Sequence, residues 1–214
     1  MALGGTGTWL TSRRGTRIRF TTRDEELVVI MPVLKAEPVI HPTNLLQLAS
    51  TTGNRRWWAV YTKARQEKAF ARHLLAMNVP FYLPLISKDN LIRGRRIQSF
   101  IPLFSGYVFL FGDKEERTQG LKTNRTSMIL PVDDQAQLLI DLRQVSTMID
   151  AGAALTVESR LTPGNRVRIK TGPMAGLEGK VIIRRGQTRL LVAIQMLQQG
   201  VSVEIDDFQL ESLN

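Results

Sequence analysis

The sequence predicts an α+β protein: an N-terminal α/β sandwich with a mainly antiparallel sheet, then a linker, then a small all-β barrel. Three observations favour this. Between residues 55 and 149, short apolar runs of strand length alternate with two stretches of helical period. Residues 162–214 hold four strand-like runs separated by turn residues. Residues 150–161, with Gly152, three alanines and no aromatic residue, have the composition of an interdomain linker, so we expect the two domains to tumble independently.

Residues 1–54 show no sustained period and are predicted to be a disordered leader. Thr, Gly and Arg dominate its start, and Pro32, Pro38 and Pro42 interrupt its second half. Because Met31 precedes a proline-rich stretch that runs directly into the first domain, the sequence leaves two translation starts open, Met1 and Met31.

The first domain opens with a short apolar run, WWAVY at 57–61, which predicts a buried strand. A helix is expected over residues 65–77, because Phe70, Leu74 and Met77 recur at i, i+4 and i+7. Pro80 stops its continuation. The polar stretch at 112–127 suggests a short helix or turn followed by a loop. Further strands are expected over 81–86, 98–103, 107–111 and 128–132.

The strand at 107–111 is apolar on both faces. Tyr107, Phe109 and Phe111 alternate with Val108 and Leu110, which is typical of a central strand. Just before it stands a glycine at position 106, which suits a bulge or a close approach of two backbones.

A last helix of this domain is expected to begin after Asp133 and Asp134, with Gln137 completing a capping box. Its buried stripe is predicted from the spacing i, i+4, i+7, i+11, which is occupied by Leu138, Leu142, Val145 and Ile149.

The net charge of +10 is concentrated in one segment. Residues 55–133 carry 14 Lys and Arg against 6 Asp and Glu, a net charge of +8. This concentration favours an anionic partner. The cationic turn RGRR at 93–96 leaves two interpretations open, a nucleic-acid contact or a solvated turn that protects a sheet edge.

No catalytic constellation is visible, so the sequence predicts neither an enzyme nor a bound cofactor. The two histidines, His41 and His73, are far apart, and the absence of cysteine excludes disulfides, thiolate metal sites and cysteine nucleophiles. No apolar run reaches the roughly 18 residues of a membrane helix. A cysteine-free chain fits a reducing compartment, and we expect a cytoplasmic protein with no membrane partner.

Two segments carry a family resemblance. WWAVYTKARQEKAFARHL followed by IPLFSGYVFLF resembles the N-terminal domain of the NusG family of transcription elongation factors, and PGNRVRIKTGPMAGLEGKV resembles that family's KOW module. The resemblance covers about residues 56–210. RGRR at 93–96, PLF at 102–104 and the position of His73 are most similar to the specialised RfaH-like antiterminator paralogues.

The resemblance implies a transcription elongation or antitermination factor whose N-terminal domain binds RNA polymerase. Its aromatic pocket would take the tip of the polymerase clamp helices, and the matched positions are Tyr61, Phe104, Tyr107 and Phe109. The alternative is that these aromatic side chains simply fill the core. A basic face would contact the non-template DNA strand or nascent RNA, with candidate residues Lys63, Arg72, His73, Arg93, Arg95, Arg96, Lys122, Asn124 and Arg125. The region matching the family's gate-loop contact, residues 117–119, departs from the family pattern.

For the KOW module, the resemblance places turn residues at Gly164, Gly172, Pro173, Gly176 and Gly179. It implies a partner contact at Leu197, with the termination factor Rho or a small-subunit ribosomal protein as possible partners. We expect a barrel that does not switch to a helical form, and a monomer. The alternative function is a ribosome-associated RNA-binding protein, which explains the basic charge and the barrel but not the aromatic α+β domain.

Overall fold

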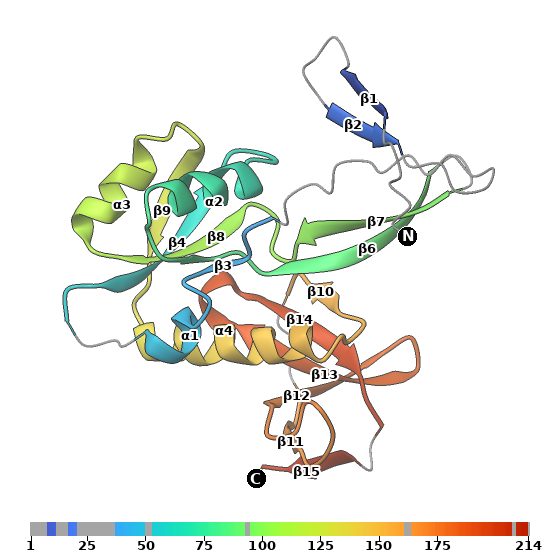
Figure 1. Cartoon of the computed structure of the whole chain (residues 1–214). Helices are drawn as coiled ribbons and strands as arrows, with labels where there is room; N and C mark the ends of the chain where they lie inside the picture. The colour runs from blue at the N-terminus through green and yellow to red at the C-terminus, as the bar shows by residue number, and fades with distance from the viewer. Residues whose placement is uncertain are drawn as a thin grey trace, which may run out of the picture. The chain divides into compact units, whose positions relative to one another are not determined.

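The computed structural model of the chain describes residues 8–11, 17–20, 37–49, 53–92, 95–160, 164–206 and 209–213. The chain divides into two units, Met1–Ala36 and Glu37–Asn214. The first unit holds an antiparallel hairpin of β1 (Thr8–Thr11) and β2 (Arg17–Phe20). The second contains all of the other helices and strands described (Figure 1).

A five-stranded antiparallel sheet forms the centre of the N-terminal part of this second unit. Its strand order is β3 (Ile40–His41), β5 (Phe81–Tyr82), β8 (Tyr107–Gly112), β4 (Arg56–Thr62) and β9 (Thr126–Pro131). The strands predicted at 57–61, 107–111 and 128–132 are confirmed as β4, β8 and most of β9. Apolar residues on both faces place β4 and β8 inside the sheet, so helices must cover both sides.

Helices cover the two faces of this sheet as separate pairs (Figure 1). α2 (Glu67–Ala76) and α3 (Lys114–Leu121) lie on one face, where Phe70 and Leu74 pack with Val60, Val108 and Leu110. α1 (Leu45–Leu48) and α4 (Gln135–Asp150) lie on the other. There the predicted α4 stripe packs in one cluster with Trp57, Phe109 and Phe111, so both helix predictions are confirmed. No helix in the described ranges is both long and apolar enough to cross a bilayer.

The strand predicted at 81–86 is interrupted. β5 ends at Tyr82, and β6 (Leu85–Ile92) pairs instead with β7 (Arg95–Pro102) as a separate hairpin. Between the two strands lies Pro84, which has no N–H to donate to a continuing ladder. Its carbonyl accepts the N–H of Leu103 at 2.8 Å. The β6–β7 hairpin therefore diverges from the sheet at Pro84. The apolar run at 81–86 gave no indication of this break.

The capping box was predicted at the wrong helix. Asp134 does accept the N–H of Gln137 at 2.8 Å, but the Gln137 amide donates to Asp141 instead of returning to the cap. A reciprocal box occurs at the start of α3, where Asp113 accepts the N–H of Glu116 and Glu116 accepts that of Asp113. The starts of α3 and α4 both have the residue spacing of a capping box, and only the side-chain contacts distinguish them.

The predicted disordered leader is wrong for residues 37–49. β3 pairs with β5, and Leu45 and Leu46 of α1 lie in the same core cluster as Trp57 and Leu138. The Arg143 guanidinium of α4 also donates to the Leu46 carbonyl at 2.7 Å. A four-residue helix has no measurable period, so no local pattern indicated this tertiary contact. The rest of the predicted leader, apart from β1, β2 and positions 53–54, lies outside the described residues.

The C-terminal part is a six-stranded antiparallel sheet. Its order is β10 (Thr156–Glu158), β14 (Gln199–Glu204), β13 (Gln187–Ile194), β12 (Glu178–Arg184), β11 (Arg166–Ile169) and β15 (Leu210–Ser212). The four predicted strands are confirmed. A hairpin turn at Arg185-Gly186 joins β12 to β13, and both turn residues have positive φ. A closed barrel is not found among the described residues, because β10 and β15 remain as the two edges.

Part of the predicted linker belongs to this sheet. The linker was expected over 150–161, but position 150 ends α4 and residues 156–158 form β10, which pairs with β14. Arg189 donates to Thr156 Oγ1 at 2.9 Å, and the Ser202 hydroxyl donates to Glu158 at 2.6 Å. Only residues 151–155 therefore separate α4 from the C-terminal sheet. The domain limits at 149 and 162 stay a prediction.

Two leucines of α1 give a matched test of the corrected leader. Leu46 is 3% exposed and Leu48 is 67% exposed. Leu46→Ala should lower the free energy of unfolding by about 2–5 kcal/mol, the usual cost of a cavity in a packed core. Leu48→Ala should change it by less than about 0.5 kcal/mol. Chemical denaturation measures both, and equal, negligible effects would show that residues 37–49 are not part of the folded core.

Candidate functional site

Two exposed side chains and one half-buried side chain lie side by side at one end of the five-stranded sheet. The strand register places Tyr61 of β4 between Tyr107 of β8 and Met128 of β9. Tyr61 is 40% exposed, Met128 is 51% exposed, and Tyr107 is half-buried. The two tyrosine rings lie 5.1 Å apart between centroids. We call Tyr107, Tyr61 and Met128 the tyrosine row.

The other two predicted pocket residues lie beneath the surface. Phe104 and Phe109 are fully buried and pack edge to face, with ring centroids 6.4 Å apart. Both belong to the core cluster against which Tyr107 packs. The structure thus exposes Tyr61 and Tyr107, places the two phenylalanines behind them, and adds Met128, which the sequence analysis missed because the register between β4 and β9 cannot be seen from spacing.

A buried carboxylate fixes the turn that leads into Tyr107. The Gly106 N–H donates to Glu67 Oε1 at 2.7 Å, and the Gly106 carbonyl accepts the N–H of Thr62 at 2.7 Å. Gly106 has φ +85°, and a Cβ there would stand 2.7 Å from the Tyr61 ring. The close contact at Gly106 is therefore with the ring of Tyr61, whereas the sequence predicted a bulge or a close approach of two backbones. Glu67 was missed because an acid in a first helical turn usually faces solvent.

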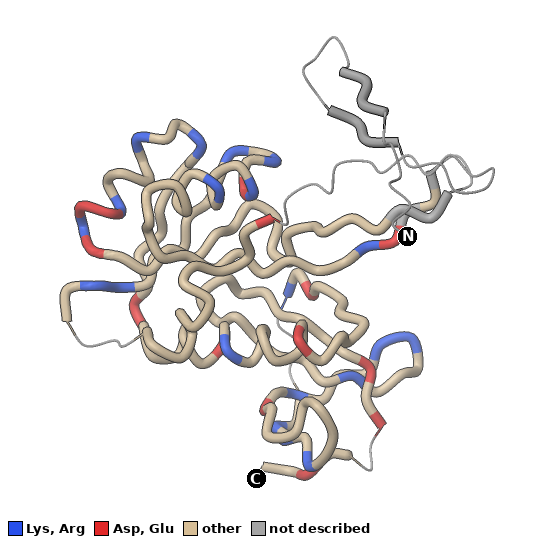
Figure 2. The backbone as a smooth tube through the Cα atoms, viewed as in Figure 1, with Lys and Arg blue, Asp and Glu red and all other residues tan. Residues whose placement is uncertain are grey.

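Two loops carrying cations adjoin the tyrosine row. The Lys63 N–H donates to the Arg125 carbonyl at 2.8 Å, which joins the loop after β4 to the loop before β9. The Lys63 ammonium donates to Asn124 Oδ1 at 2.8 Å, and the Arg125 guanidinium donates to Gln66 Oε1 at 2.6 Å. We call residues 63–66 and 122–125 the basic loops. Figure 2 shows Lys and Arg recurring in the loops around α2 and α3.

The structure thus brings together four predicted nucleic-acid residues in the basic loops: Lys63, Lys122, Asn124 and Arg125. Two others lie on α2: Arg72 forms an ion pair with Glu37 at 2.7 Å, and His73 is exposed beside it. Three remain: Arg93, Arg95 and Arg96. Arg93 lies outside the described residues, and Arg95 and Arg96 begin β7, with side chains outside the described set.

The predicted KOW glycines occupy positions with little room for a side chain or with positive φ. A Cβ on Gly164 would stand 2.2 Å from the Val181 carbonyl, and one on Gly179 would stand 2.5 Å from the Leu191 carbonyl. Gly172 and Gly176 have positive φ and lie, with Pro173, in the exposed turn between β11 and β12. Gly164 and Gly179 therefore allow close approach of neighbouring strands, and Gly172 and Gly176 allow the turn between β11 and β12.

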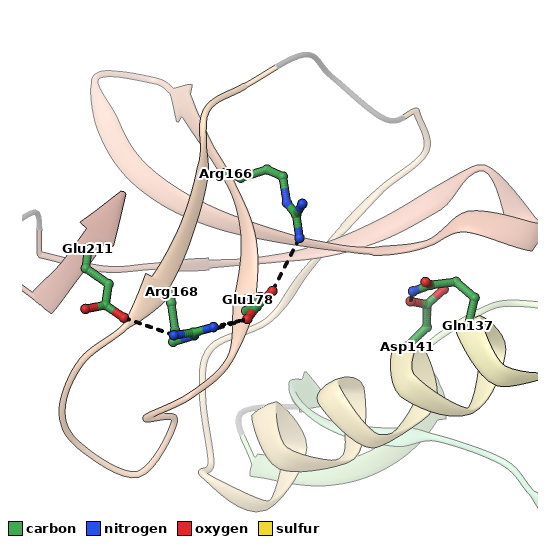
Figure 3. A network of polar contacts seen from close by, with 6 residues as sticks. All are labelled: Gln137, Asp141, Arg166, Arg168, Glu178 and Glu211. Carbon is green, nitrogen blue, oxygen red and sulfur yellow. Dashed lines mark hydrogen bonds and ion pairs between the residues drawn. The ribbon is translucent and has the colours of Figure 1, made fainter. Parts of the chain in front are cut away.

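An ion-pair network crosses three strands of the C-terminal sheet (Figure 3). Glu178 of β12 accepts from Arg168 at 2.6 Å and from Arg166 at 3.4 Å, and Arg168 also donates to Glu211 of β15 at 3.4 Å. The hydrogen bond from Arg168 is the main reason that the pKa of Glu178 lies below its usual value. The network ties the edge strand β15 to β11 and β12.

The predicted partner contact, Leu197, lies in a 3₁₀ turn, η1 (Gln195–Leu197), that touches α4. Asp141 of α4 accepts the Gln195 N–H at 3.0 Å and the Gln137 amide at 2.7 Å. Burial raises the pKa of the Asp141 carboxyl, and these two hydrogen bonds lower it in part. Figure 3 shows Asp141 and Gln137 together on the helix. Asp141 was missed because it lies off the apolar stripe and so suggested a solvated position.

The N-terminal part of the second unit is thus a small α+β fold with the tyrosine row at one end of its sheet. Residues 55–155, which span β4 to α4 and include the tyrosine row and the basic loops, match the family described as "Transcription termination factor nusG". These residues therefore form a NusG-family domain. No curated protein sequence matches the chain at a significant level.

The Glu67–Gly106 contact should be measurable as stability. Glu67→Ala leaves a buried N–H without a partner, which typically costs about 1–3 kcal/mol. Glu67→Gln keeps an acceptor oxygen and should cost less. Glu115→Ala, which removes an exposed acid from α3, serves as the control. Denaturation curves give the free energy of unfolding of each variant. If Glu67→Ala is at least as stable as Glu67→Gln, the carboxylate does not hold the turn.

Proposed function

We propose that this protein is a transcription elongation factor that binds RNA polymerase through the tyrosine row and the displaced non-template DNA strand through the basic loops. One observation carries the proposal: the row and the loops adjoin at the same end of a NusG-family sheet. Only one residue separates Tyr61 from Lys63 along the chain, and Met128 of β9 lies three positions after Arg125. NusG-family proteins are transcription factors rather than enzymes, which supports a binding role.

The tyrosine row has the properties of a protein-binding anchor. Aromatic and methionine side chains are enriched at interfaces, and rigid strands reduce the entropy lost on binding. The buried pair Phe104 and Phe109 and the Glu67–Gly106 contact hold the row in place from behind. The family resemblance implies the polymerase clamp helices as the element that binds here.

The basic loops have the properties of a contact to single-stranded nucleic acid. Lys63 and Arg125 come from different segments, and hydrogen bonds to Asn124 and Gln66 hold both side chains in defined positions. Each phosphate contact adds a counterion-release slope of roughly 0.7 for a single strand. A small number of such contacts would strengthen binding only where a displaced strand is present, as in a transcribing complex.

The C-terminal sheet is proposed to act as a KOW module that recruits a protein through the turn containing Leu197. The glycines at 164, 172, 176 and 179 and the strand order support this assignment. The proposal includes RfaH-like specialisation, and it keeps both Rho and a ribosomal protein as partners. With such a module the protein would connect RNA polymerase to Rho or to a ribosomal protein.

Substitutions in the tyrosine row and in the basic loops should affect binding in different ways. Tyr61→Ala or Tyr107→Ala should weaken binding to free polymerase by about 30-fold, which is the loss of one anchor of about 2 kcal/mol. The loss should depend little on salt. Lys63→Ala and Arg125→Ala should leave binding to free polymerase nearly unchanged. They should weaken binding to an assembled elongation complex and flatten its dependence on salt concentration.

Binding is measured at several salt concentrations, with Ile183→Ala on the C-terminal sheet as the control. If a tyrosine variant unfolds, its ring belongs to the core. Circular dichroism therefore accompanies each binding measurement. If the folded tyrosine variants bind free polymerase like the unchanged protein, the row is not the polymerase surface. If the Lys63 and Arg125 variants bind the elongation complex with an unchanged dependence on salt concentration, the basic loops do not contact DNA.

A further inference from the structure

The cations predicted to contact nucleic acid differ in what their own side chains bind. Arg72 of α2 donates to both carboxylate oxygens of Glu37, at 2.8 and 2.7 Å. Lys63 instead donates to the neutral amide of Asn124 at 2.8 Å. A neutral amide positions a cation and leaves its charge available, whereas a carboxylate cancels that charge. The positive charge available to an anionic ligand therefore lies in the basic loops and not at Arg72.

Glu37 comes from a part of the chain that the family match does not include. The match begins at residue 55, and Glu37 precedes β3, the edge strand that pairs with β5. The Glu37 side chain is 30% exposed and that of Arg72 is 55% exposed. An ion pair this open to solvent adds little to stability. Its principal consequence is electrostatic, because it removes the charge of Arg72 from the surface of α2.

Arg65 lies at a turn position that favours other residues. The Gln66 N–H donates to the Lys63 carbonyl at 3.0 Å, which closes a four-residue turn with Arg65 at its third position. Arg65 has φ +59°. A turn with positive φ at this position favours glycine or asparagine, because other side chains are strained there. The neighbouring basic loop follows this rule, since its residue with positive φ is Asn124.

No contact within the described parts of the chain accounts for an arginine at this position. Arg65 is exposed, and its guanidinium forms no ion pair, hydrogen bond or aromatic contact with the described residues. Strained backbone positions cluster at functional sites. The next residue, Gln66, accepts a hydrogen bond from the Arg125 guanidinium at 2.6 Å. Arg65 is therefore an unneutralised cation within the hydrogen-bonded pair of basic loops.

We propose that Arg65 directly contacts the phosphates of the bound nucleic-acid strand, and that the contact surface does not extend to Arg72 because Glu37 keeps that residue paired. This inference rests on the proposed function, which makes the basic loops the nucleic-acid surface. The ligand group is the sugar–phosphate backbone, since a set of cations recognises charge and carries no sequence information. Glu37 thus sets the limit of the contact surface along α2.

Arg65→Asn tests the first half of the proposal in the full chain. Asparagine tolerates positive φ, so the melting temperature should rise by about 2–4 °C. Binding to an assembled elongation complex should nevertheless weaken several-fold. The slope of its salt dependence should fall by roughly 0.7, the value of one phosphate contact on a single strand. Arg65→Lys keeps the charge and should keep the slope.

Arg185→Asn is the matched control for the backbone change. Arg185 is also an exposed arginine with positive φ, at +52°, in the turn between β12 and β13. Its replacement should raise the melting temperature in the same way, for the same reason. It should leave both the affinity for the elongation complex and the salt dependence unchanged.

Glu37→Gln tests the second half of the proposal. Because it frees Arg72, it should strengthen binding to the elongation complex and raise the slope of the salt dependence by roughly 0.7. Adding Arg72→Ala should cancel this gain, and Arg72→Ala alone should change neither quantity. Glu115→Gln makes the same change of net charge at an exposed position of α3 and should leave the slope unchanged.

Lys63→Ala and Arg125→Ala in the same titrations separate this proposal from the proposed function. If they weaken binding while Arg65→Asn does not, Arg65 is not a contact and the proposed DNA binding stands. A lower melting temperature for Arg65→Asn would assign the side chain to the fold and also overturn its role. A gain from Glu37→Gln that persists with Arg72→Ala, or no gain at all, overturns the role of Glu37. If no cation variant weakens binding, both proposals fail.

Discussion

The two-sided burial of α4 is the constraint on which the rest of the structure depends. Its stripe of Leu138, Leu142 and Val145 covers one face of the five-stranded sheet, and Arg143 binds the short helix α1. Its polar side carries Asp141, which accepts a hydrogen bond from the C-terminal sheet. An amphipathic helix normally leaves its polar side to water. Here the polar side is a second interface, so one helix joins the five-stranded sheet and α1 to the C-terminal sheet.

The end of the five-stranded sheet beyond α4 is not covered by that helix. Trp57 and Ala59 are fully buried under the helices, whereas Tyr61, two residues further along the same face, is exposed. The row of Tyr107, Tyr61 and Met128 is thus the continuation of the core onto the surface, which gives an apolar anchor on a rigid support. The basic loops begin where the row ends, and the proposed binding of a protein beside a nucleic acid rests on this arrangement.

The sequence predicted the elements whose signal is local, and it failed where a contact is made between distant segments. Alternation in 107–111 and the helical period of α4 were sufficient to place those elements. The packing of Leu46, the pairing of β10 and the burial of Asp141 depend on partners about 45–100 positions away along the chain. At the site, family resemblance supplied Tyr61 and Tyr107, but alternation alone could not separate these exposed rings from the buried Phe104 and Phe109. Met128 and Glu67 required the register and the turn geometry.

The central claim is that the tyrosine row faces RNA polymerase, and site-specific photo-crosslinking tests it most directly. A photoreactive phenylalanine analogue at position 128, which is exposed in the row, is compared with the same analogue at position 183 on the C-terminal sheet. Within a transcribing complex, we expect position 128 to crosslink to a polymerase subunit and position 183 not to. Crosslinking to polymerase from 183 but not from 128, in chains that both enter the complex, would contradict the account.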